Sequence, residues 1–181
     1  RTAPRLLKLW REGVCLIDEV DVVLHPLKSE LNFPIGRKED LDFAPLRWHL
    51  PMHIVDAVLA VSQGVPAQTT GHKAQAVLAR LRKAVELGYE QCFLQRQPHL
   101  ILLNLSYYHN KLKPILADWL GLWLAQQGLD MIKHGSSVLR FVAGDRLGTA
   151  DHINALPKER FIKMVNLAHD WLASFLPHCL Q

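Results

Sequence analysis

The sequence predicts a mostly helical fold with a small β element. Apolar residues recur at helical spacing in four segments, namely 51–63, 73–87, 114–127 and 157–176. A run of four apolar residues at 14–17 leads directly into a carboxylate cluster, which is typical of a buried strand. The chain has 181 residues, 49% of them hydrophobic, and is therefore long enough to bury one sizeable core.

The first elements are expected around that strand. Residues 4–12 are predicted to form a short helix that ends at Gly13, because glycine favours the backbone conformation that terminates helices. The strand over 14–17 follows. Residues 36–50 are polar and include Pro45, so we expect a surface connection there. Residues 1–50 therefore form the first part of the chain.

The second part, residues 51–181, is expected to be a helical unit. Pro51 is predicted to open its first helix, because proline suits the first helical turn. Thr70 is predicted to cap a second helix. A single late strand is predicted over 137–143, where valine and phenylalanine are enriched before Gly144.

Composition limits the setting in which the chain works. Its 21 basic and 17 acidic residues give a net charge of +4, which by itself does not indicate nucleic-acid binding. The 3 cysteines are odd in number and lack CxxC spacing, so an intracellular, cytoplasmic location is expected rather than a disulfide framework or zinc site. Apolar runs such as 100–103 are far shorter than the roughly 20 residues of a membrane span, and no membrane partner is expected.

Three carboxylates follow the predicted strand directly. Ligands of open α/β sheets bind outside the carboxyl ends of the strands. In nucleotide hydrolases an Asp at that place holds Mg²⁺ against the phosphates, and a neighbouring Glu can activate water. We therefore expect Asp18 to be the Mg²⁺ ligand and Glu19 to be the catalytic residue. This is the pattern of a Walker B motif of the DExD type.

Together with Asp18, two further residues are expected to bind the nucleotide. Asp21 is expected to link the site to a neighbouring element. His25 lies four residues further on, where an imidazole would sense nucleotide or brace a carboxylate. Packing of His25 as a turn residue before Pro26 is an equal alternative. The cluster also has a simpler explanation, in which a core strand exits into solvent.

Asp18-Glu19-Val20-Asp21, which follows an apolar strand and precedes a short apolar stretch, resembles motif II of the superfamily 2 helicase-like ATPases, above all the SecA branch. The longer segment 18–36 is also similar to a stretch of very large eukaryotic proteins with a helicase-like ATPase region. The resemblance implies Mg²⁺ and ATP as cofactors of the intact protein, with the remaining ATPase core as partner. It also implies a protein or nucleic-acid strand that is moved. Gly148-Thr149-Ala150, after the predicted late strand, is similar to motif III, although a loop entering a helix explains it as well.

A phosphate-binding loop is missing from the sequence. No GxxxxGK[ST] occurs, and residues 69–74 have the lysine without the glycine spacing. We therefore expect one half of an ATP site, in a chain that is either an α+β domain or a fragment of an α/β ATPase core. Neither Mg²⁺ nor ATP is expected to bind tightly to this chain alone.

Other interpretations of the sequence stay open. A non-catalytic helical scaffold or protein-interaction module would use the acidic cluster as an ion-pair surface. A segment of a large ubiquitin-related hydrolase is implied by the resemblance alone, since Cys15 has no histidine signature nearby. His49, His53 and Asp56 have a spacing that suits a metal, but Pro51 is expected to start the helix between the two histidines, which favours an ordinary pair.

Overall fold

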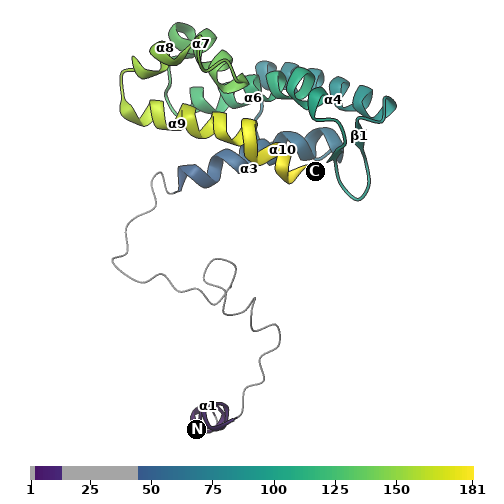
Figure 1. Ribbon diagram of the computed structural model, residues 1–181, viewed down its shortest axis with the longest axis vertical. Helices are drawn as coiled ribbons and strands as arrows, with labels where there is room; N and C mark the ends of the chain where they lie inside the picture. The colour runs from purple at the N-terminus through teal and green to yellow at the C-terminus, as the bar shows by residue number, and fades with distance from the viewer. Residues whose placement is uncertain (1–2, 14–44) are drawn as a thin grey trace. The chain divides into compact units, whose positions relative to one another are not determined.

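The computed structural model describes residues 3–13 and 45–181 (Figure 1). The chain divides into two units, residues 1–41 and 42–181. In the first unit, helix α1 (Ala3–Glu12) confirms the helix predicted over 4–12. Lys8 and Glu12 form an ion pair of 3.8 Å on its exposed surface. The strand predicted over 14–17 lies outside the described residues.

The second unit is built from helices that follow one another with short connections. Its longer helices are α3 (Leu46–Ser62), α4 (His72–Glu90), α6 (Lys113–Gln126), α7 (Met131–Ala143) and α9 (Glu159–Asp170). Shorter elements are α5 (Leu105–Tyr107), α8 (Ala150–Asn154), α10 (Leu176–Cys179) and the π-helical turns η1 (Tyr108–Leu112) and η2 (Trp171–Phe175). Strands β1 (Leu94–Gln95) and β2 (Ile101–Leu102) pair antiparallel. The prediction of a mostly helical fold with a small β element is confirmed.

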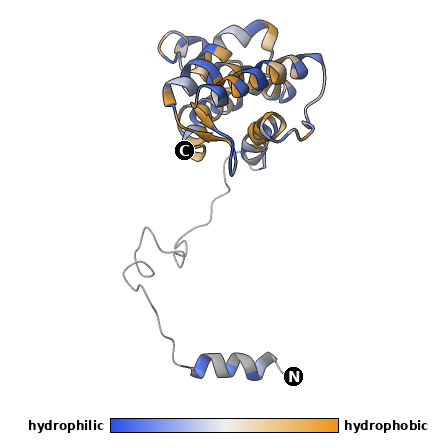
Figure 2. Cartoon of the chain, turned by 90° about the vertical axis from the view of Figure 1, so that its right-hand side faces the viewer, coloured by the Kyte–Doolittle hydropathy of each residue, from blue (hydrophilic) through white to orange (hydrophobic). Residues whose placement is uncertain are grey.

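Helix α6 lies at the centre of this unit. It packs against α3, α4, α7 and α9, and its buried side chains include Trp119, Leu120, Trp123 and Leu124. A helix that is apolar on all sides is stable only when other elements cover it. Along the surrounding helices apolar residues alternate with polar ones (Figure 2). The core is therefore organised around α6.

Proline does not open the first helix of the unit, contrary to the prediction. Helix α3 begins at Leu46, and Pro51 lies inside it. Proline cannot donate a backbone hydrogen bond there, but Leu50 and Ile54 on either side of it are buried in the core. Packing of these side chains outweighs the lost bond. As a result, His49 and His53 belong to one helix.

The strand predicted over 137–143 is also wrong, because these residues form the last turns of α7. The carboxylate of Asp130 accepts hydrogen bonds from the N–H groups of Ile132 and Lys133, at 3.0 and 3.1 Å, and so caps the start of the helix. Val138 and Val142, four residues apart, are both fully buried. Helical spacing, rather than β propensity, places these valines in the core.

The start of α4 and the last predicted helix also differ from the sequence predictions. The N-cap of α4 is Gly71, with a φ of 116°, so the prediction that Thr70 caps this helix is wrong. The long helix predicted over 157–176 is present as α9, η2 and α10 in sequence. After α10, the backbone carbonyl of Leu180 accepts a hydrogen bond of 2.6 Å from the N–H of Leu102. This bond ties the end of the unit to β2.

Two tyrosines whose hydroxyl groups are buried give a matched pair for measuring one hydrogen bond. The hydroxyl of Tyr108 donates to the carbonyl of Leu172 at 2.7 Å, whereas the buried hydroxyl of Tyr89 has no hydrogen-bond partner among the described residues. Tyr108→Phe should lower the free energy of unfolding by about 1–2 kcal/mol, because a buried carbonyl loses its donor. Tyr89→Phe should be neutral or stabilising, since it removes an unpaired polar group. Urea denaturation measures both, and a larger loss for Tyr89→Phe would contradict this account.

Candidate functional site

The acidic motif lies outside the described residues. Asp18, Glu19, Asp21 and His25 all fall within 14–44. Their predicted roles in binding Mg²⁺ and nucleotide and in activating water therefore stay predictions. The described residues offer a second polar site, which involves the histidine pair noted in the sequence.

That second site is a cavity of about 270 Å³ where α3, α6 and the connection before α4 meet. Helix α3 contributes His49, His53 and Asp56 on successive turns. The connection contributes Thr69, and α6 contributes Trp123. Three residues that the sequence singled out as a possible ligand set thus line one cavity, because α3 continues through Pro51.

His53 is held on both ring nitrogens. Its Nε2 lies 2.9 Å from the carbonyl oxygen of Trp119, and its Nδ1 lies 3.3 Å from the hydroxyl of Thr69. Because a carbonyl can only accept, Nε2 carries the proton in the neutral ring and Nδ1 accepts from Thr69. The ring stacks on Trp119 with centroids 4.6 Å apart. Burial lowers the pKa of His53, so the neutral form is favoured.

Asp56 anchors the connection before α4. Its carboxylate accepts hydrogen bonds from the backbone N–H of Gln68, at 2.9 and 3.1 Å, and from that of Thr69 at 3.4 Å. The carboxylate of Asp56 and both ring nitrogens of His53 are therefore occupied by hydrogen bonds within the protein. These bonds hold the connection before α4 in place. Within residues 3–13 and 45–181, no group of three His, Cys, Asp or Glu side chains has the geometry of a metal site.

The arrangement resembles a nucleophile and its base, with Thr69 beside a neutral, oriented imidazole. The backbone N–H groups of Gln68 and Thr69 are, however, bound to Asp56 and do not stabilise an oxyanion. The cavity is thus better suited to hydrogen bonding with a small polar molecule than to acyl transfer. Sequence reasoning missed Thr69 and Trp119, which lie far from His53 in the chain.

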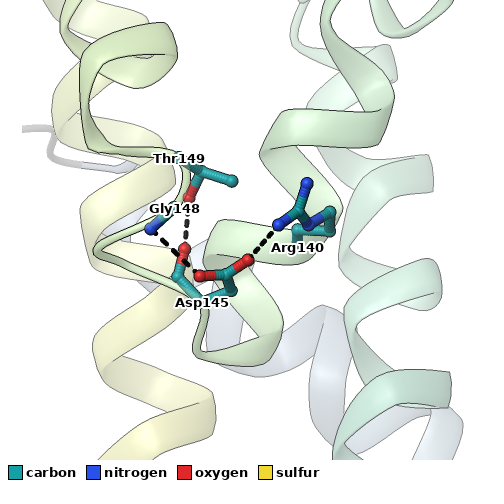
Figure 3. Close-up of polar contacts among 4 residues, drawn as sticks. All are labelled: Arg140, Asp145, Gly148 and Thr149. Carbon is teal, nitrogen blue, oxygen red and sulfur yellow. Dashed lines mark hydrogen bonds and ion pairs between the residues drawn. The ribbon is translucent and has the colours of Figure 1, made fainter.

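The residues similar to motif III form a turn (Figure 3). The carboxylate of Asp145 forms an ion pair with Arg140 and accepts a hydrogen bond of 3.1 Å from the N–H of Gly148. The hydroxyl of Thr149 donates to the carbonyl of Asp145. Thr149 is the N-cap of α8. The segment is therefore a loop that leads from one helix into the next, with no strand before it.

Comparison of the chain with protein-family models, curated proteins and solved structures finds no match in any of the three. Among the helices that the structure describes, none combines the length and the apolar character that crossing a membrane requires.

Proposed function

We propose that this chain supplies the acidic motif, and a helical unit that follows it, to an ATP-hydrolysing motor of the helicase-like or SecA-like kind. The observation that carries the proposal is the run of four apolar residues at 14–17 directly before Asp18, Glu19 and Asp21. Asp18 binds Mg²⁺, Glu19 activates water, and Asp21 and His25 contact the nucleotide or its surroundings. The phosphate loop comes from another part of the ATPase core.

The role of the helical unit is to move or to bind the partner of the motor, and not to carry out chemistry. Its best-formed polar cluster, around His53 and Asp56, holds a connection in place and does not present a free ligand set. The partner of such a unit is the polymer being moved, a protein or a nucleic-acid strand. We also propose an intracellular, cytoplasmic location, which the free and exposed thiols of Cys92 and Cys179 support.

The 181-residue chain alone is expected not to hydrolyse ATP. Mg²⁺ binds in such sites mainly through the nucleotide phosphates, and the sequence has no GxxxxGK[ST] to hold them. Phosphate release measured with millimolar Mg·ATP should equal the buffer background. Turnover that disappears in Glu19→Gln would contradict this expectation.

The proposal itself is tested in a longer protein that carries a phosphate loop. Glu19→Gln should abolish turnover there and keep ATP binding, because the amide cannot accept a proton from water. Glu12→Gln is the matched control, since Glu12 is an exposed residue of α1 that forms a surface ion pair with Lys8. Retained turnover in Glu19→Gln would reject the ATPase assignment.

A second function, that of an interaction module, is favoured by one observation on α3. Trp48, Met52 and Val55 are 60%, 63% and 43% exposed. Their spacing of four and three residues places them along one face of the helix. A stripe of exposed apolar side chains is typical of surfaces that bind other proteins. If Glu19→Gln has no effect on the activity of the longer protein, this function becomes the better explanation.

A further inference from the structure

A second and larger cavity lies between α4, α6 and α7. Its volume is about 490 Å³, within the range of small-molecule sites. Its apolar lining includes Val77, Leu122, Ala125, Met131 and Leu139. We call this cavity the α4–α6–α7 groove. None of the residues given a role in the proposed ATPase lines it.

The floor of this groove is firmly packed. A Cβ atom added to Gly121 would lie 2.7 Å from Cδ2 of Leu139, so α6 and α7 approach closely at that point. Ala76 and Ala125, which have short side chains, also line the groove. Met131, which is half-buried, adds a flexible and polarisable wall. The groove therefore offers an apolar trough with a solid base.

One end of the groove is positive. Lys73 lines the groove and also an adjoining cavity of about 350 Å³ at the start of α4. In the described part of the chain, Lys73 forms no hydrogen bond or ion pair, whereas Arg80 is paired with Asp118 at 2.7 Å. The N-cap of α4 is Gly71, and among the described residues no side-chain hydrogen bond caps this helix start. The uncapped helix start adds its positive dipole to the charge of Lys73.

We propose that the α4–α6–α7 groove binds a single-chain amphiphile with a carboxylate head. The apolar chain lies on the floor between α6 and α7, and the head lies at Lys73 and the first turn of α4. Charge complementarity selects an anionic head. The occupant is expected to be a small ligand and not a docked protein segment. A stable protein interface buries about 800 Å² on each partner, whereas the groove is of the size of a small-molecule site.

The probe is decanoate, titrated into the 181-residue chain by calorimetry, with decyltrimethylammonium as the partner of equal chain length and opposite charge. Decanoate should bind saturably at one site and about tenfold more tightly, because the two heads differ in the sign of their interaction with Lys73. Lys73→Glu should remove or reverse that preference. Lys83→Glu is the matched control, since Lys83 is exposed on the same helix but does not line the groove.

A second variant tests the apolar floor. Ala125→Phe should weaken binding of both probes by tenfold or more, because the new ring occupies the trough. Ala155→Phe, at an exposed position outside the groove, should leave binding unchanged. Circular dichroism establishes that each variant is folded. Absence of saturable decanoate binding, equal affinity for both heads, or unchanged binding in folded Ala125→Phe would each overturn the proposal. So would an acidic amphipathic peptide that binds the groove when decanoate does not.

Discussion

Replacing Trp119 with alanine is expected to lower the free energy of unfolding by about 3–5 kcal/mol. Trp119 is fully buried on the central helix α6. Its indole Nε1–H donates a hydrogen bond of 2.7 Å to the carbonyl of His53, and its ring stacks on that histidine. Truncation therefore leaves a large cavity and removes a partner from a buried polar group. Urea denaturation followed by circular dichroism measures the change.

The same substitution elsewhere in the chain gives the control. Trp48 is 60% exposed on α3, so Trp48→Ala should change stability by no more than about 0.5 kcal/mol. Similar losses in both variants would contradict the packing described for α6. The comparison holds the chemistry of the substitution constant and varies only burial.

Lowering the pH from 7.5 to 5.5 is expected to destabilise the helical unit through His53. Burial lowers the pKa of His53 in the folded state, so the unfolded chain binds the proton more readily. The stabilisation is complete above the unfolded pKa of about 6.5 and is lost as the pH falls toward the folded pKa. Each unit between the two pKa values corresponds to about 1.4 kcal/mol of stability.

The histidine responsible can be identified by substitution. His53→Gln should reduce the pH dependence between 7.5 and 5.5, whereas His99→Gln, at an exposed position, should retain it. His109 contributes with the same sign, because partial burial and the nearby Lys113 lower its pKa. Its contribution is smaller than that of His53, because its side chain is largely exposed. The lowered pKa values of Asp130 and Asp145 act below this pH window. An unchanged pH profile in His53→Gln would assign the effect to other groups.

The sequence predicts most helices because their apolar residues recur at the spacing of one helical face. It fails where tertiary packing competes with a local preference. The valines of 137–143 have β propensity, but the cap at Asp130 and the burial of Val138 place them in a helix. Pro51 normally marks a helix start, yet burial of Leu50 and Ile54 extends α3 in front of it.

The polar site was only partly predictable for a different reason. The spacing of His49, His53 and Asp56 shows that they share a helix face once the helix is known. Nothing in the local sequence links His53 to Thr69 or to Trp119, which is 66 residues away. Such partners follow from the docking of helices, which depends on the whole core.

The contacts between His53 and Trp119 have a mechanical consequence. Each side chain donates a hydrogen bond to the backbone carbonyl of the other residue, so two opposed bonds join α3 to α6. A slide of one helix past the other along its axis would break both bonds at once and separate the stacked rings. The pair therefore resists sliding of α3 along α6. We therefore expect a pull applied along α3 to move α6 with it, because slippage between the two helices would have to break these contacts.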